Sequence, residues 1–224
     1  MDKRLKKYII LWLSQSVSGL GSSITGFSLV LWAYGQSHSA MSISLMSFFH
    51  YVPYIFCSLF VGGFIDRHKK KTIMLLSDSI AAAGSLIVFI CLLQGNLSIW
   101  AIYVVHIIIG ITNAFQQPAS AVAIGRLVPK EKISNVSGMN SFSNNMIVVF
   151  SPMLAASFYA IGGLPLILLI DLLSFIAAFC VLWFFIDIPE QMEENIYNSP
   201  FAGIMEGYLF LKKEKDILYL MFTM

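Results

Sequence analysis

The chain has 224 residues, of which 58% are hydrophobic and only 12% are charged, with a formal net charge of +2. Soluble domains carry about 25% charged residues and disordered chains are poor in apolar ones, so this composition excludes both classes. Together with a mean hydropathy of +0.78, it predicts a protein whose solvent is lipid.

Six stretches are apolar enough, and long enough at roughly 20 residues each, to cross the hydrocarbon core of a bilayer as helices. They cover 8–34, 42–65, 73–94, 98–118, 138–160 and 163–186. The joins at 35–37, 94–96 and 162–163 contain glycine, and two of them add Ser or Asn, which favour turns. The sequence therefore predicts an all-α, polytopic membrane protein with six transmembrane helices.

The 14 Lys and Arg residues lie at the N-terminus and after the second, fourth and sixth predicted spans. The loops after the first, third and fifth spans contain none. Because cytoplasmic loops are enriched in Lys and Arg, this distribution predicts a multi-pass protein of the cell membrane with a cytoplasmic N-terminus.

The character of the sequence changes after residue 186. Residues 187–215 are polar and charged, which predicts a cytoplasmic linker that follows a six-helix bundle over 1–186. Residues 216–224 are apolar but too few to span a bilayer, so we interpret them as the start of a truncated seventh helix. The chain thus looks like the first half of a larger protein.

The segment between the second and third spans is the most specific in the chain. It resembles the signature loop of the major facilitator superfamily, Gly-x-x-x-Asp-Arg-x-Gly-Arg-Lys. The matching positions are Gly62, Asp66, Arg67 and Lys71, with Lys70 as a conservative replacement for Arg and Lys69 in place of the second Gly. We expect Gly62 to permit close helix approach, Asp66 to cap a helix end, and the basic residues to meet the anionic inner leaflet. The alternative is an ordinary basic loop.

Residues 110–138 and 206–211 resemble the drug-efflux branch of that superfamily, which includes macrolide exporters. The resemblance implies two six-helix bundles with the substrate path between them, of which this chain would supply the N-terminal bundle. The family's antiporter pattern in the fifth helix, Gly-x-x-x-Gly-Pro-x-x-Gly, is matched only in part, by Ser151 and Pro152. Pro152 is expected to bend that helix. The implied activity is proton-coupled efflux of drugs such as macrolides by alternating access.

Three ionisable residues inside the predicted spans are candidates for proton coupling, because such residues are costly in a membrane. Asp171 lies near the middle of the sixth span, His106 lies deep in the fourth, and Asp78 lies in the third, nearer the cytoplasm. Each also has a structural interpretation. Asp171 would bond a neighbouring helix, His106 would be a packing residue, and Asp78 would be a charge partner for the basic loop.

Polar residues in the spans are candidates for lining a path. They are Gln15, Asn113, Gln116, Asn140 and Asn144. In the first span, Ser14, Ser18, Ser22 and Gly26 recur at intervals of four, a spacing that either faces a cavity or lets helices pack closely.

Chemistry other than transport finds little support in the sequence. There is no nucleotide-binding loop, no His/Cys cluster for a metal and no Ser/His/Asp set, so we predict neither an enzyme nor a cofactor or metal site. The expected partners are the lipid bilayer, a small amphipathic substrate, protons, and a missing C-terminal six-helix half or a second copy, with no nucleic acid. The alternatives are a non-transporting truncated six-helix membrane protein and a self-associating half-transporter.

Overall fold

The computed structural model describes residues 3–188, and every long element in that part of the chain is helical. The elements are α1 (Lys3–Ser37), α2 (Ala40–Arg67), α3 (Lys70–Leu93), α4 (Ile99–Leu127), the 3₁₀ turn η1 (Lys130–Lys132) and α5 (Ile133–Phe184). All five α-helices are long and apolar enough to cross a membrane. The predicted all-α membrane fold is confirmed at this level. The predicted linker and seventh helix lie outside the described residues, except for 187–188.

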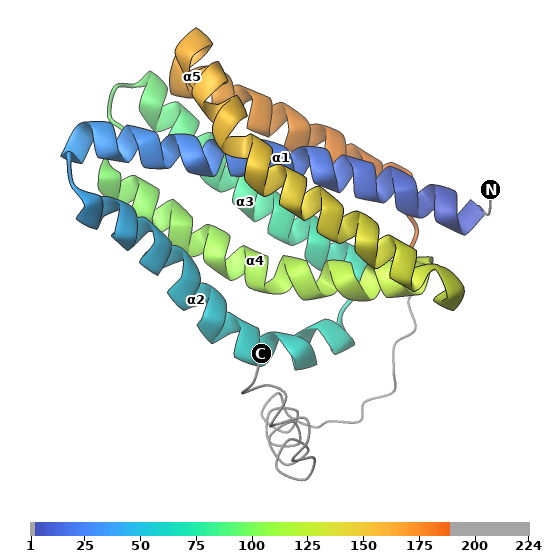
Figure 1. Cartoon of the computed structure of the whole chain (residues 1–224). Helices are drawn as coiled ribbons and strands as arrows, with labels where there is room; N and C mark the ends of the chain where they lie inside the picture. Colours follow the sequence, from blue (N-terminus) through green and yellow to red (C-terminus); the bar gives the residue numbers. More distant parts are fainter. Residues whose placement is uncertain (1–2, 189–224) are drawn as a thin grey trace, which may run out of the picture.

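The number of continuous helices differs from the six predicted, because the fifth and sixth spans form one 52-residue element. Within α5 the backbone leaves helical geometry at Gly163, where φ is +63° and ψ is −165°. A positive φ of this kind is accessible to glycine and strained for other residues. Gly163 therefore divides α5 into two arms, 133–162 and 164–184, and Figure 1 shows the chain reversing direction between them.

The helices also extend beyond the predicted apolar spans. The fourth was expected to end at residue 118, yet α4 continues through Pro118 to Leu127. Serines fix two of the starts: the side chain of Ser39 accepts a hydrogen bond from the backbone amide of Met41 in α2, and that of Ser98 accepts one from the amide of Ala101 in α4. Hydropathy marks only the part of a helix that meets lipid, so polar turns at the ends of a helix escape it.

Two apolar clusters close the bundle at its two ends. One, around Tyr8, Ile65 and Met74, joins the helix ends that lie near the loop between α2 and α3. The other, around Leu29, Met46 and Leu168, joins the opposite ends. In Figure 1, α1 runs beside both arms of α5, while α2 lies beside α4. The space between the two clusters holds the polar residues described below.

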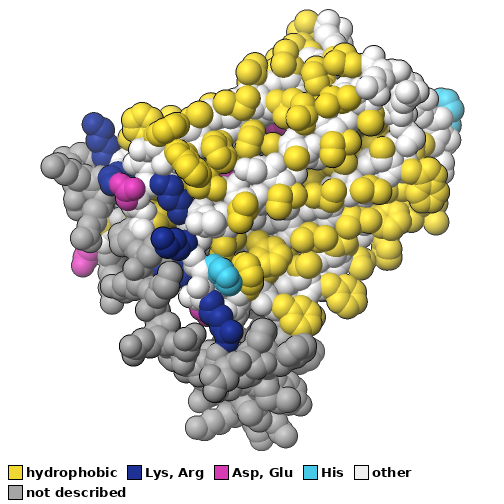
Figure 2. Space-filling model, turned by 180° about the vertical axis from the view of Figure 1, so that it is seen from behind, with side chains coloured by type: hydrophobic (Ala, Val, Ile, Leu, Met, Phe, Trp, Pro, Cys, Tyr) yellow, Lys and Arg dark blue, Asp and Glu magenta, His cyan; other side chains and the backbone are white. Residues whose placement is uncertain are grey.

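The outer surface of the bundle is apolar over most of its length. Figure 2 shows hydrophobic side chains covering the face in view, while Lys and Arg gather at one end. Large apolar side chains such as Phe56, Leu93 and Val148 are more than half exposed. A surface of this kind is stable only against lipid or another apolar partner, and the chain is a multi-pass membrane protein.

Candidate functional site

A cavity of about 720 Å³ lies inside the bundle, with residues from all five α-helices in its wall. This size is within the range of pockets that take drug-sized ligands. The wall includes the ionisable side chains of Asp78, Asp171, His50, His106 and Tyr51, and no Lys or Arg of the described chain lines it. The cavity therefore places acidic and imidazole groups inside an otherwise apolar bundle.

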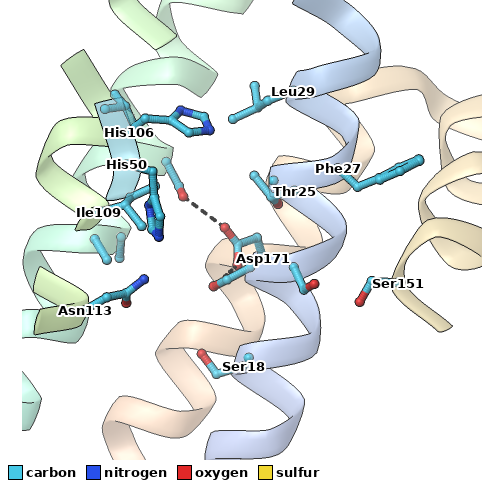
Figure 3. A pocket seen from close by; sticks show the side chains of 18 of the residues that line it. Ser18, Thr25, Phe27, Leu29, His50, His106, Ile109, Asn113, Ser151 and Asp171 are labelled. Carbon is cyan, nitrogen blue, oxygen red and sulfur yellow. Dashed lines mark hydrogen bonds between the residues drawn. The ribbon is translucent and has the colours of Figure 1, made fainter. Parts of the chain in front are cut away.

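Asp171, on the second arm of α5, is only 4% exposed and joins three helices. Ser22 of α1 donates a hydrogen bond to its Oδ1 atom at 3.0 Å, and Ser85 of α3 donates to Oδ2 at 2.9 Å. Figure 3 shows Asp171 between α1 and the wall that carries the histidines. Both carboxylate oxygens are thus occupied by neutral hydroxyl groups, and the bonds fix the positions of α1 and α3 against α5.

Asp78 makes a second polar junction, among α1, α3 and α4. Gln116 donates from Nε2 to the Oδ1 atom of Asp78 at 2.8 Å, and Gln15 donates to Oδ2 at 3.3 Å. The Gln116 Nε2 atom also lies 3.5 Å from Oε1 of Gln15. Asp78 also lines the cavity. The two amides take the place of the charge contact that was expected between Asp78 and the basic loop.

The two junctions follow a common register of α1 and α3. Gln15, which bonds Asp78, and Ser22, which bonds Asp171, are seven residues apart on α1. On α3, Asp78 and Ser85, the second serine that bonds Asp171, are also seven residues apart. Seven residues make two helical turns, or about 10 Å of rise. The cavity therefore has two acidic levels along one helix pair.

Two histidines lie on the opposite side, on α2 and α4. The ring centroids of His50 and His106 are 6.5 Å apart with the planes at 78°. The Nδ1 atom of His106 lies 2.9 Å from the carbonyl oxygen of Ile102, so Nδ1 carries the proton in the neutral ring and Nε2 is the free acceptor. Gly110 brings the helices close here, because a Cβ at this position would overlap the carbonyl group of His50.

The remaining path-lining candidates divide into two groups. Asn113 and Pro152 line the cavity, as do Gln15 and Gln116. Asn140 lies away from it and accepts a hydrogen bond from the hydroxyl group of Tyr8 at 3.1 Å, which ties α5 to α1. Asn144 is exposed on the first arm of α5 and is not among the cavity residues.

The serine stripe of α1 is likewise divided. Ser18, Ser22 and Gly26 line the cavity. Ser14 instead donates to the carbonyl oxygen of Leu11 in its own helix. A spacing of four residues drifts around a helix of 3.6 residues per turn, so a stripe of this length does not stay on one side.

The loop between α2 and α3 differs in detail from its expected roles. Asp66 lies in the last turn of α2 and Lys69 is the N-cap of α3, so Asp66 does not begin that helix. Nothing lies within 4 Å of a Cβ placed on Gly62, so no close helix approach depends on it among the described residues. Two of the basic side chains bond helix ends: Lys70 donates to the carbonyl oxygen of Asp66 at 3.3 Å, and Lys71 to that of Trp183 at 2.9 Å.

His50 and the two serines that bond Asp171 were not among the residues predicted from the sequence. His50 carried a usable signal, because it is an ionisable residue within the second apolar span. Ser22 was predicted only as part of a stripe that either faces a cavity or packs closely, and Ser85 offered no pattern that separates it from other serines in membrane helices. Their role depends on which helix each faces.

A bundle of membrane helices around a drug-sized cavity with polar groups in its wall fits the class of polytopic membrane transporters. The profile of the Major Facilitator Superfamily matches residues 11–224, and the chain belongs to this family. Its members are transporters rather than enzymes.

Three curated relatives illustrate the match. "Macrolide efflux protein A" of Streptococcus pyogenes is 27% identical over 217 residues, which cover 96% of this chain and 53% of that protein. "Macrolide efflux protein A" of Enterococcus faecalis is 30% identical over 186 residues, covering 82% of this chain and 57% of that protein. "Uncharacterized MFS-type transporter YfiS" of Bacillus subtilis (strain 168) is 26% identical over 217 residues, which cover 93% of this chain and 50% of that protein.

These matches confirm the predicted resemblance to the macrolide-efflux branch. The chain spans about half the length of the curated relatives it matches. No solved structure matches it at a significant level.

Proposed function

We propose that this chain forms the N-terminal half of a secondary active transporter that exports small amphipathic compounds, such as macrolides, in exchange for protons. The observation that carries the proposal is the cavity with two acidic levels inside an apolar bundle. A substrate needs room and polar contacts inside the membrane, and a coupled proton needs an ionisable group there. The names of the relatives support macrolides as the compounds to test.

Asp171 is the residue we assign to the proton. It is buried among three helices, and the hydroxyl groups of Ser22 and Ser85 either donate to its carboxylate or accept from its carboxyl form. A proton added here rearranges bonds that join α1 and α3 to α5. Proton binding is thereby linked to helix packing, as alternating access requires.

In this proposal the two arms of α5 cross the membrane separately, which gives six crossings over 1–186. Residues 187–215 link this bundle to a second one that begins near 216–224 and completes the path, either a C-terminal half or a second copy. The basic ends of the helices and the N-terminus lie in the cytoplasm of a cell-membrane protein.

Cysteine labelling tests the orientation. With the native cysteines replaced by Ser, a cysteine at His38 or Asn96 should react with a membrane-impermeant thiol reagent added to intact cells, and one at Lys69 should react only after lysis. The reverse pattern would contradict the proposed topology.

Drug accumulation tests the function. Cells that express the full-length protein should accumulate less radiolabelled erythromycin than cells without it, and a protonophore should remove the difference. Asp171→Asn should abolish proton-driven export while membrane expression, measured by immunoblot, stays unchanged. Export that persists undiminished in Asp171→Asn would remove Asp171 from the coupling step, and accumulation unaffected by expression would overturn the proposed transport.

A further inference from the structure

The junction at Asp78 is short of hydrogen-bond donors. Its carboxylate receives bonds from the amides of Gln15 and Gln116, which are neutral. The Oε1 atom of Gln116 is buried and has no partner within the described part of the chain. A buried acceptor without a donor is costly, so a ligand that brings an N–H or O–H group to this junction would remove that cost.

The charge of the cavity wall points to a cation. Its carboxylates belong to Asp78 and Asp171, its other titratable groups are His50, His106 and Tyr51, and no Lys or Arg of the described residues faces them. An ionised carboxylate in an apolar bundle is stabilised by a positive partner. The donor that Gln116 lacks, beside the Asp78 carboxylate, is therefore best supplied by a positively charged group.

Asp171 is the less suitable of the two carboxylates for this partner. It is 4% exposed, and serine hydroxyl groups from two helices occupy both of its oxygens. Asp78 is less deeply buried, and the amides that hold it end flexible side chains that can turn an oxygen toward an incoming N–H group. The two acidic levels are about 10 Å apart along the helices, so a ligand group bound at Asp78 does not contact Asp171, which remains available for the proton.

We propose that Asp78, with the amides of Gln15 and Gln116, is the binding site for the protonated amine of a cationic amphipathic substrate. The proposal rests on the transport function given above and names the charge and the anchoring residue of its substrate. The ammonium N–H donates to Asp78, and the Gln116 amide turns its oxygen toward the cation. The apolar body of the substrate occupies the rest of the cavity, where the rings of Phe27 and Phe175 line the wall.

Equilibrium binding with two probes on one skeleton tests this. Erythromycin carries a protonated dimethylamino group, and its N-demethyl-N-acetyl derivative is neutral. With the purified full-length protein in nanodiscs, Asp78→Asn should weaken erythromycin binding by about tenfold or more and leave the neutral probe within about twofold. Asp78→Glu, which keeps the charge, should retain the preference for the cationic probe.

A measurement on the wild-type protein keeps the test independent of how the variants fold. Dicyclohexylcarbodiimide modifies carboxyl groups inside membranes, and peptide mass spectrometry locates the adduct. Erythromycin should protect Asp78 from modification, and the neutral probe should not. Protection confined to Asp171, or equal loss of both probes in Asp78→Asn, would overturn the assignment while leaving transport intact. Wild-type protein that binds neither probe would instead overturn the proposed function and this site with it.

Discussion

Replacing Gly110 with alanine should destabilise the bundle, because α2 and α4 touch at this glycine. The added methyl carbon would lie 3.0 Å from the carbonyl carbon of His50 and closer still to its oxygen. Carbon atoms in contact normally stand about 3.5–4.0 Å apart, so the two backbones would have to separate by at least about 0.5 Å. Overpacking of this kind costs about 1–3 kcal/mol.

Gly125→Ala is the matched control in the same helix, since nothing lies within 4 Å of a Cβ placed there. Both substitutions gain the same helix propensity, about 1 kcal/mol, so their difference isolates the contact with His50. At about 2–4 °C per kcal/mol for a chain of this size, Gly110→Ala should melt several degrees below Gly125→Ala in a thermal-unfolding assay in detergent. Equal melting temperatures would refute the close approach of α2 and α4.

Three further substitutions probe other contacts, with thermal unfolding as the measurement. Ser85→Ala removes the 2.9 Å bond to Asp171 and should lower the free energy of unfolding by about 0.6–1.7 kcal/mol, as the loss of interhelical bonds in membranes does. In an Asp171→Ala background the same substitution should cost nothing, and an undiminished cost there would contradict the pairing. Gly163→Ala places a side chain at φ +63° and ψ −165° and should cost about 1–3 kcal/mol; an unchanged melting temperature would mean that the arms of α5 meet in another way. Lys7→Ala removes a 3.5 Å ion pair with Asp187, in which the Lys7 side chain is 43% exposed and the Asp187 side chain 88% exposed. The free energy of unfolding should therefore fall by less than about 1 kcal/mol. A larger loss would show that the pair is shielded from solvent.

Helix α1 shows which contacts its sequence could predict and which it could not. The recurrence of small and polar residues indicated a helix face with a role, and Gln15 was expected to reach a path. The sequence did not indicate that Gln15 meets Asp78, or that Ser22 meets Asp171. Those pairings depend on how far α1 is shifted and rotated against α3 and α5, which packing along the full length of the helices sets. Periodicity within one helix carries no information on that shift.

The loop and the fifth helix show the same limit. Asp66 was expected to cap a helix end, and it lies within the last turn of α2, because α2 and α3 extend until only two residues separate them. The glycines at 162–163 indicated a turn between two spans, and the backbone turns at Gly163 without leaving a loop. A turn signal locates a change of direction, while the length of the joint depends on how the two arms pack.

The sequence by itself determined that this chain lies in a membrane and that its basic residues gather at one end of the helices. The first follows from the transfer free energy of single residues between water and lipid, which sums along the chain without reference to its partners. The second follows from the order of the spans, because successive spans cross in opposite directions and the Lys and Arg residues lie only in alternate loops. Only the tertiary structure decided which polar groups meet inside the bundle. Asp171 joins Ser22 and Ser85, and Asp78 joins two glutamines, because a polar group surrounded by apolar side chains is stable only where another helix presents a matching donor.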